Sequence, residues 1–372
     1  MAIQTSHVGS LPRSQKVVDY IFAREKGEDY NEIEFDQVMT EAVNDTVRKQ
    51  KKAGITIVSD GETSKISYAT YVKDRYHGFA GDSPRNAPAD LKKFPNYLQK
   101  LANDGGTPKY ARPMCVSKLE PKKNDDLIKD IDNLKKALRR NDIKKGFMNA
   151  ASPGVISLFL QNDYYPSRED YLEALSNLMQ SEYEMIVKSG LDLQIDCPDL
   201  ALSRHMLFND MTDDEFVKIA SINIESLNNA LRNIPKDKIR IHICWGNYEG
   251  PHVCDISISK MFETLMNVKT GHILFEAANP RHAHEWEVFE EKKNLIPDDL
   301  ILMPGVIDTT TNFVEHQNLV VQRLKNFTNI VGNERVIGSS DCGFGTFAGF
   351  GTIDPDIAYE KLKVLAEGAA KV

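Results

Sequence analysis

Eight short apolar runs alternate along this chain with longer stretches of helical period, and this alternation constrains the fold more than any other feature. The runs are Gln4 to Val8, Ile55 to Asp60, Gly146 to Ala150, Leu191 to Asp196, Ile239 to Cys244, His272 to Glu276, Ile301 to Ile307 and Arg335 to Ser340. Continuous apolar runs are typical of buried parallel strands, and their alternation with helices favours βαβ units over an antiparallel sheet. Eight such units predict an α/β fold, a single (β/α)8 TIM barrel over residues 1–372.

Helices are predicted where apolar residues recur at intervals of three and four and acidic residues lead. These stretches are Ser167 to Ser189, Asp213 to Arg232, Ile256 to Val268, Thr311 to Phe327 and Asp354 to Ala370. The segment from Thr63 to Lys145 is too long for an ordinary β/α connection, and it holds two charged helical segments, around Ala89 to Asn103 and Asn124 to Arg140. We interpret residues 63–145 as an insertion over the barrel mouth, either a functional lid or a decorative extension.

Composition narrows the class of protein. The chain has 372 residues, 41% of them hydrophobic, which is enough for one large domain. Its net charge is -8 and no Lys/Arg block is dense enough to follow a phosphate backbone, so we expect no nucleic-acid partner. No run approaches 18 apolar residues and no secretory signal begins the chain, which predicts no membrane partner and a cytoplasmic protein. Five scattered cysteines indicate free thiols rather than a disulfide framework.

Reactive groups follow seven of the eight runs. In barrels of this kind the active site lies at the carboxyl ends of the strands. The groups are His7-Val-Gly9-Ser10, Asp60-Gly-Glu62, Asp196-Cys197-Pro-Asp199, His242-Ile-Cys244, Glu276, Asp308 and Asp341-Cys342-Gly343. Any single one could be a satisfied structural polar group, but seven at one end of a barrel predict an active site.

The donor atoms in this set suit a metal. His242 and Cys244 alternate along a strand, so both side chains point to the same face. Glu276 and Cys342 would complete a set of nitrogen, sulfur and oxygen donors that suits tetrahedral zinc better than magnesium or calcium. The wide spacing of the four residues excludes a zinc-finger knuckle and requires a closed fold.

Other cysteines and histidines offer competing interpretations. His252-Val-Cys254 repeats the short spacing, but it follows Gly250-Pro251 and therefore belongs to a loop. Cys197 is either a ligand or a small buried thiol, and Cys115 is expected to be an ordinary, partly buried residue. His282 and His284 are interpreted as a surface or supporting pair rather than as ligands.

The motifs at several strand ends resemble those of the cobalamin-independent methionine synthase family, specifically its catalytic carboxyl-terminal barrel. The resemblance runs over nearly the whole chain. It rests on His7-Val-Gly-Ser-Leu-Pro-Arg13, Asp60-Gly-Glu62, Gln194-Ile-Asp196-Cys-Pro198, His242-Ile-Cys244, Phe275-Glu276, Gly305-Val-Ile-Asp308 and Ser340-Asp-Cys-Gly343. It implies a barrel fold and a Zn²⁺ site with His242, Cys244, Glu276 and Cys342 as ligands.

The same resemblance implies a homocysteine site. Gly9 and Ser10 would hold the amino-acid carboxylate, and Glu62 and Asp196 would hold the ammonium, an arrangement that suits a desolvated pocket. The alternative for these two acidic residues is structural support of the barrel mouth.

Three features depart from the family. Its full-length members carry a second, amino-terminal barrel that helps bind the folate donor, whereas this chain matches the catalytic half. Those enzymes show Asp-x-His after strand seven, with the histidine proposed as a general acid, but Asp308 is followed by Thr309, Thr310 and Thr311. A tryptophan of their folate site has no counterpart in Val155 to Leu160, unless Phe159 substitutes. The acceptor half of the site is kept and the donor half is not; in that half Asp308 is the predicted catalytic residue.

Thiolate is the nucleophile in thiol alkylation, and a bound zinc ion would provide it at neutral pH. We therefore predict a zinc-dependent thiol S-methyltransferase (EC 2.1.1 type) for homocysteine or a related aminothiol, with 5-methyltetrahydrofolate as one candidate donor. Glu276, the hardest ligand, is the one expected to loosen when the thiol binds. Alternatives are an epoxide:thiol transferase like epoxyalkane:coenzyme M transferase, a zinc hydrolase, and a non-catalytic zinc-binding protein. A homo-oligomer or a partner protein that delivers the donor is left open.

Overall fold

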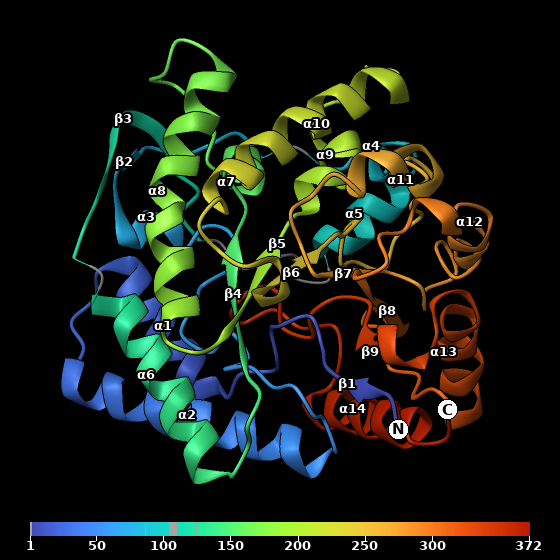
Figure 1. Ribbon diagram of the computed structural model, residues 1–372. Coiled ribbons are helices and arrows are strands. Elements are labelled where there is room, and N and C mark those ends of the chain that lie inside the picture. Colours follow the sequence, from blue (N-terminus) through green and yellow to red (C-terminus); the bar gives the residue numbers. More distant parts are fainter. Residues whose placement is uncertain (1, 86, 104–109, 124) are drawn as a thin grey trace.

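A curved parallel sheet of seven strands forms the centre of the protein. The computed structural model describes residues 2–85, 87–103, 110–123 and 125–372. Strands β1 (Gln4–Thr5), β4 (Phe147–Ala151), β5 (Asp192–Asp196), β6 (Ile239–His242), β7 (His272–Phe275), β8 (Ile301–Ile307) and β9 (Ile337–Ser340) pair in the order β1-β9-β8-β7-β6-β5-β4. Every neighbouring pair is parallel, and helices surround the sheet (Figure 1), so the predicted α/β class is confirmed.

The predicted second strand, residues 55–60, is not a regular strand. Val58 forms one parallel bridge with Gly146, and the amide of Ile57 donates to the Thr5 carbonyl at 3.0 Å. The Thr5 amide, however, donates to the side-chain oxygen of Thr56 at 2.8 Å, so a side chain takes the place of a backbone partner. The segment lies between β1 and β4, but the closed eight-stranded barrel is not confirmed.

Three strands end earlier than predicted. β1 ends at Thr5, β6 at His242 and β7 at Phe275, whereas the predicted runs reached Val8, Cys244 and Glu276. Cys244 and Glu276 therefore lie in the loops just beyond the carboxyl ends of their strands.

In the described part of the chain, seven longer helices surround the sheet, and seven shorter ones lie in the connections. The longer ones are α1 (Gln15–Lys26), α2 (Glu32–Lys52), α6 (Asp125–Arg140), α8 (Arg168–Lys188), α10 (Asp213–Ala230), α13 (Gln317–Val331) and α14 (Pro355–Ala369). The shorter ones are α3 (Val72–Arg75), α4 (Ala89–Lys92), α5 (Pro95–Asn103), α7 (Pro153–Phe159), α9 (Ser203–Met206), α11 (Ile258–Leu265) and α12 (Trp286–Glu291). Among the described residues, no helix has the length and apolar character needed to cross a membrane.

A capping residue explains where α14 begins. Asp354 accepts hydrogen bonds from the amides of Asp356 and Ile357, and Pro355 occupies the first turn of the helix. The prediction that a helix begins at Thr311 was wrong, because the Thr311 amide and hydroxyl bind Asp308 instead and α13 begins only at Gln317.

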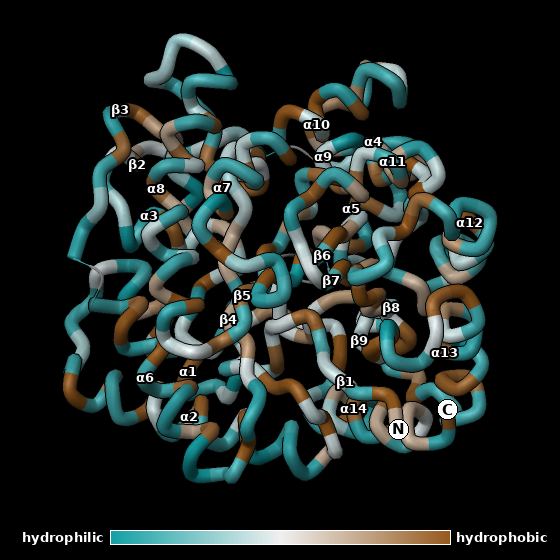
Figure 2. The backbone as a smooth tube through the Cα atoms, viewed as in Figure 1, coloured by the Kyte–Doolittle hydropathy of each residue, from teal (hydrophilic) through white to brown (hydrophobic). Residues whose placement is uncertain are grey.

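The core lies between the strands and the inner faces of the helices, where the hydrophobic segments of the chain gather (Figure 2). Phe275 of β7 stacks on Phe289 of α12, with ring centroids 4.4 Å apart, and meets Phe327 of α13 edge-on at 5.4 Å. This packing holds β7, and thus the loop that carries Glu276, against the outer helices.

Residues 63–145 hold more structure than the two predicted helical segments. They include a two-stranded antiparallel sheet of β2 (Tyr76–Ala80) and β3 (Met114–Pro121). The sequence analysis missed it because these strands are half exposed and interrupted at Gly78. The helix α6 packs on α2 in the outer layer, as an ordinary crossover helix would. Residue 124, where that helix was expected to begin, lies outside the described residues. In the described part, α4 reaches the sheet's carboxyl end, where Asp90 binds Tyr248 and His252.

Candidate metal and thiol site

Three predicted ligands come together at the carboxyl ends of the strands. His242, Cys244 and Cys342 are buried, and one donor atom from each lies within 4.8 Å of the others. The two Sγ atoms are 3.0 Å apart, and Cys342 Sγ lies 3.8 Å from His242 Nε2. The chain thus brings together residues 100 positions apart, as the predicted fold requires.

Asp196 orients the histidine of this cluster. Its Oδ1 lies 3.0 Å from His242 Nδ1, which leaves Nε2 directed at the cysteines. Its Oδ2 accepts a hydrogen bond at 2.9 Å from Asn149 Nδ2, which also donates to the Val8 carbonyl at 3.0 Å. A carboxylate behind a histidine is the usual support of a metal ligand, because it fixes the tautomer and the ring orientation.

The donor set fits zinc. Tetrahedral zinc separates two sulfur ligands by roughly 3.8 Å and a sulfur from a nitrogen by roughly 3.6 Å. The 3.8 Å between Cys342 and His242 already matches, and the sulfurs of Cys244 and Cys342 need to separate by roughly 0.8 Å. Two thiols and one imidazole are a donor set that zinc prefers.

Glu276 lies beside this cluster but is not part of it. Its Oε1 accepts from the Trp245 amide at 2.8 Å and its Oε2 from Asn279 Nδ2 at 2.7 Å. Asp341 accepts four further hydrogen bonds from residues 277–279 and so holds the turn after Glu276. Both oxygens of Glu276 thus have protein partners.

The pocket raises the pKa of both cysteine thiols. The contact with Cys244 and burial raise the pKa of Cys342 well above its ordinary value. Cys342 lowers the pKa of Cys244, but burial and the charge of Glu276 outweigh this and leave it raised. Two thiolates therefore require a compensating positive charge in this pocket.

A cavity adjoins the cluster and contains the predicted amino-acid site. Its walls include Ser10, Glu62, Asp196, Tyr68 and Gly343, together with the three cluster residues. Gly343 has no room for a side chain, because a Cβ atom there would lie 1.9 Å from Ser10 Oγ. The structure therefore brings every predicted substrate residue to this cavity except Gly9, which lies behind it.

Gly9 leaves room for the side chains of Asn149 and Glu62. A Cβ atom at Gly9 would lie 2.5 Å from Asn149 Nδ2 and 2.6 Å from Glu62 Oε1. Asn149 and Tyr68 are site residues that the sequence analysis missed. Asn149 could have been identified from the sequence, because it is the one polar residue in the apolar run 146–150, whereas no sequence feature distinguishes Tyr68.

Glu62 is held in a strained and desolvated position. Its φ is 53°, which is uncommon for a residue other than glycine, and its Oε2 has no hydrogen-bond partner among the described residues. Arg13 donates to its carbonyl oxygen at 2.6 Å and fixes the backbone. Burial raises the pKa of Glu62 to about 8, with Lys65 lowering it and Asp196 raising it further. An unpartnered buried carboxyl group that faces Asp196 is suited to bind a cation.

Asp308 is already satisfied by its neighbours. Its Oδ1 accepts from the amide and hydroxyl of Thr310, and its Oδ2 from those of Thr311 at 3.0 and 2.6 Å. These four bonds account for the carboxylate as the organiser of the turn after β8; its predicted catalytic role stays a prediction.

The remaining cysteines and histidines are separate from the cluster. Cys197 is fully buried and its thiol faces the Ile195 carbonyl at 3.7 Å. Cys115 is wholly buried rather than partly buried as expected. His282 is buried and paired with acidic groups, whereas His284 is exposed, so the two do not form a pair.

A second cavity lies on the other side of Cys342. Cys342, Gly246 and Asn247 line both cavities, and the second also contains His252, Glu276, Arg281, Asp308 and the three threonines. Cys342 therefore borders both cavities, whereas His242 and Cys244 line the first.

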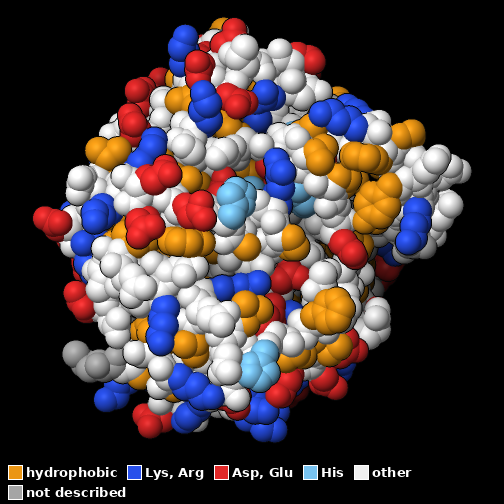
Figure 3. Space-filling model, turned by 90° about the vertical axis from the view of Figure 1, so that its right-hand side faces the viewer, with side chains coloured by type: hydrophobic (Ala, Val, Ile, Leu, Met, Phe, Trp, Pro, Cys, Tyr) orange, Lys and Arg blue, Asp and Glu red, His pale blue; other side chains and the backbone are white. Residues whose placement is uncertain are grey.

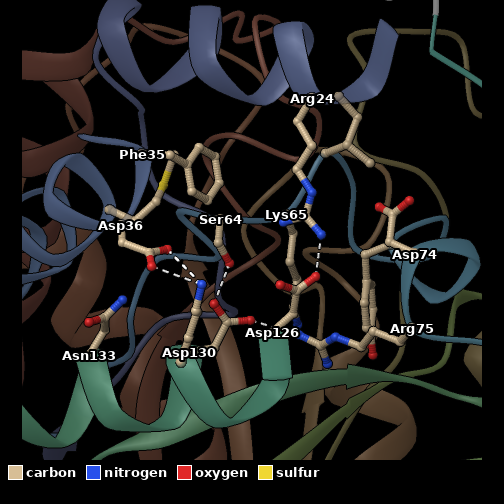
Figure 4. Close-up of a pocket in the computed structure, with 14 residues that line it drawn as sticks. Arg24, Phe35, Asp36, Ser64, Lys65, Asp74, Arg75, Asp126, Asp130 and Asn133 are labelled. Carbon is tan, nitrogen blue, oxygen red and sulfur yellow. Dashed lines mark hydrogen bonds and ion pairs between the residues drawn. The ribbon is translucent and has the colours of Figure 1, made fainter. Parts of the chain in front are cut away.

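A third, charged cavity lies between α1, α2 and α6, behind the loop that carries Glu62 (Figure 4). Asp130 accepts from Ser64 Oγ and Arg75 Nη2, both at 2.6 Å, and Arg75 Nη1 donates to Glu182 at 2.8 Å. Burial raises the pKa of Asp130 to about 6. These charges satisfy one another, so the cavity supports the Glu62 loop rather than offering free ligands.

The molecule is thus a parallel α/β protein with a zinc-type cluster at the carboxyl ends of its strands, between two cavities. No protein-family model matches the chain. It is 26% identical to methionine synthase of Thermococcus kodakarensis over 368 residues, covering 98% of this chain and 92% of that protein. It is 24% identical to 2-hydroxypropyl-CoM lyase of Xanthobacter autotrophicus over 397 residues, covering 99% and 94%.

Two solved structures have a similar fold. The B12-independent methionine synthase of Shewanella sp. W3-18-1, in complex with selenomethionine, superposes with a TM-score of 0.71 at 19% identity, covering 99% of this chain and 97% of that one. The corresponding Listeria monocytogenes protein gives 0.69 at 17% identity, covering 100% and 99%. The chain is therefore a full-length homologue of the methionine synthases and of 2-hydroxypropyl-CoM lyase, with the fold of the B12-independent methionine synthases.

Proposed function

We propose that this protein is a zinc-dependent methyltransferase that methylates the thiol of homocysteine or a related aminothiol. The observation that carries the proposal is the position of the His242, Cys244 and Cys342 cluster, which forms one wall of the cavity that also contains Glu62 and Asp196. The methionine synthase homologues support the same reaction class.

His242, Cys244 and Cys342 would hold the ion, and Glu276 would be the fourth ligand in the absence of substrate. Glu276 can exchange readily, because Trp245 and Asn279 already supply partners for its oxygens. When bound, zinc lowers the pKa of a thiol and so supplies a thiolate nucleophile at neutral pH.

The protein's own residues would select and orient the aminothiol. Glu62 and Asp196 would bind the ammonium group and Ser10 would bind the carboxylate, with Gly9 behind them. Asp196 would act twice, since it also orients His242. Burial of all these groups excludes water, which strengthens each charge interaction.

A second candidate is alkyl transfer to a thiol that has no ammonium group, and the 2-hydroxypropyl-CoM lyase homologue favours it. Two buried acidic residues would repel the anionic end of such a thiol, so we place it behind homocysteine. A zinc hydrolase and a non-catalytic zinc protein rank lower, because neither uses the Glu62 and Asp196 cavity.

Two features of the fold belong to this proposal. We propose that residues 55–60 complete a closed eight-stranded barrel, as their bonds to Thr5 and Gly146 suggest. We also propose that residues 63–145 provide the lid, because Asp90 of α4 binds the loop that lines the second cavity. We further propose that the protein is cytoplasmic and that 5-methyltetrahydrofolate is its methyl donor.

The test is methylation of homocysteine by iodomethane at pH 6.5, where free thiols of pKa about 8.5 are mostly protonated. The zinc-loaded protein should accelerate this reaction, C342S should lose the acceleration, and C254S, which alters a cysteine outside the cluster, should keep it. Preference for homocysteine over 3-mercaptopropionate would support the ammonium site. Preference for 2-mercaptoethanesulfonate would favour the second candidate, and no acceleration of any thiol would refute thiol activation.

A further inference from the structure

The substrate cavity beside the cluster holds two polar groups without a partner in the described part of the chain. One is Glu62 Oε2, a buried acceptor. The other is the hydroxyl of Tyr68, which lines the same cavity and forms no hydrogen bond with any described residue. A tyrosine hydroxyl that is removed from bulk water usually has a hydrogen-bond partner. An acceptor and a donor that are both free in one cavity indicate a ligand that carries the complementary pair of groups.

Aromatic packing fixes the ring of Tyr68. The ring meets Phe159 of α7 edge-on, with centroids 5.8 Å apart, and is tilted against Phe347 at 6.1 Å. The backbone on either side of these contacts is tied together as well, because the Ala348 amide donates to the Ile66 carbonyl at 2.9 Å. A side chain that is already fixed loses little conformational freedom when it binds a ligand, so its hydrogen bond adds more to affinity.

The hydroxyl of Tyr68 keeps its proton beside the reactive groups of the cavity. Burial raises the pKa of Tyr68 well above its ordinary value, and the charges of Cys244, Tyr110, Asp196 and Cys342 act in the same direction. A protonated phenol is a hydrogen-bond donor. Carboxylate and sulfur around it are acceptors, but none of them accepts from it, so the donor is available to a ligand.

A carboxylate that enters this cavity needs such a donor. No lysine or arginine is among the described residues that line it, so hydrogen bonds from hydroxyl groups take the place of an ion pair. Two other hydroxyls are present, and each already accepts a hydrogen bond. Ser10 Oγ accepts from the Gly345 amide at 3.4 Å. Thr346 Oγ1 accepts from Asn247 Nδ2 at 2.7 Å, which leaves Tyr68 as the one hydroxyl of this cavity without a partner in the described part of the chain.

We propose that Tyr68 is a specificity-determining residue whose hydroxyl donates a hydrogen bond to the α-carboxylate of the aminothiol. The assignment rests on the proposed function, because it adds a third contact to the same substrate. The cluster binds the thiol, Glu62 and Asp196 bind the ammonium group, and Tyr68 with Ser10 binds the carboxylate. Three contacts from fixed side chains distinguish the two enantiomers of an α-amino acid, so the cavity selects one of them.

The unpartnered oxygen of Glu62 favours an amino acid over other acidic thiols. The hydroxyl of Tyr68 could also donate to a sulfonate, but a sulfonate thiol without an ammonium group would leave Glu62 Oε2 unpartnered. An amine thiol without a carboxylate would leave the Tyr68 hydroxyl unpartnered instead. A substrate with both groups satisfies both residues.

The experiment measures the affinity of the zinc-loaded protein for two thiols by calorimetry. Homocysteine carries the carboxylate, and 3-aminopropane-1-thiol is the same molecule without it. Y68F removes only the hydroxyl and should weaken homocysteine binding about 10- to 100-fold, as expected for a hydrogen bond to a charged group. It should leave the affinity for 3-aminopropane-1-thiol unchanged. Wild-type protein should prefer one enantiomer of homocysteine, and this preference should fall in Y68F.

Y164F is the matched control, because Tyr164 is 50% exposed and does not line this cavity. An equal loss for both thiols in Y68F would show that Tyr68 only shapes the cavity, and no loss for either would show that its hydroxyl binds nothing; both results overturn the proposal. Wild-type protein that binds the two thiols equally well would overturn it without any variant, and this comparison decides if Y68F does not fold. That result would leave thiol activation intact, whereas a protein that binds neither thiol would refute the proposed function itself.

Discussion

Replacing Asp196 with asparagine tests the link between the substrate cavity and the metal cluster. Asp196 contacts His242 Nδ1 at 3.0 Å and Asn149 Nδ2 at 2.9 Å. In D196N the amide oxygen can still accept from the histidine, but its NH₂ group would then face the NH₂ group of Asn149. Asn149 cannot turn over without loss, because its Nδ2 also donates to the Val8 carbonyl. One hydrogen bond of this buried network must therefore fail.

The expected cost follows from this geometry. Loss of a group that supports a metal-binding histidine lowers metal affinity by about 10- to 100-fold, or about 1.4 to 2.8 kcal/mol. Competition with a chromogenic zinc chelator measures this value, and homocysteine affinity should fall in parallel because half of the ammonium site loses its charge. D192N is the matched control, because Asp192 is a partly buried residue at the opposite end of the same strand. Unchanged zinc affinity in D196N would refute the account of how His242 is oriented.

Three further perturbations test the surroundings of the site. Glu62, whose pKa is raised to about 8, must lose a proton to bind an ammonium group. Calorimetry should therefore show that the affinity of the wild-type protein for 2-aminobutyrate rises about tenfold from pH 6 to pH 7, whereas that of E62Q does not rise. A wild-type affinity that does not change between these pH values would contradict this. Gly9→Ala should destabilise the protein by about 1–3 kcal/mol in urea unfolding, since the new Cβ atom would overlap Asn149, and an unchanged midpoint would be the contrary result. Arg75→Met leaves the buried carboxylate of Glu182 without its cation and should cost about 3–5 kcal/mol in the same assay, whereas a loss within error would argue against the ion pair.

Acidic and basic side chains intermingle on the face of the molecule in Figure 3. This agrees with the even distribution of charge along the sequence, from which we expect no nucleic-acid partner.

Much of the fold was predictable because buried parallel strands leave a plain sequence signal. β8 matches its predicted run, Ile301 to Ile307, at both ends. The two-stranded sheet of β2 and β3 was not predictable, because its strands are half exposed and their apolar and polar residues alternate only weakly. The segment 55–60 was predicted to be a regular strand for a different reason. Its apolar pattern is that of a buried strand, but the side chain of Thr56 takes the place of a backbone partner in one hydrogen bond with β1.

The site was predictable to the extent that position along a strand fixes position in space. His242, Cys244 and Cys342 followed from the rule that strand ends share one edge of the sheet. The hydrogen bonds that satisfy Asp308 and Glu276 could not be foreseen, because they depend on turns such as residues 276–279 and 308–311. The contacts of Asp255 with His205, His252 and His282 could not be foreseen either, because helix α9 and two separate loops bring these histidines together.

The most direct test of the central claim is zinc-edge X-ray absorption of the purified protein, with proton release recorded during a homocysteine titration. We predict about one zinc per chain with two sulfur neighbours from Cys244 and Cys342, a third sulfur on addition of homocysteine, and one proton released per thiol bound. Absence of zinc, or zinc whose sulfur coordination ignores every thiol offered, would contradict the account.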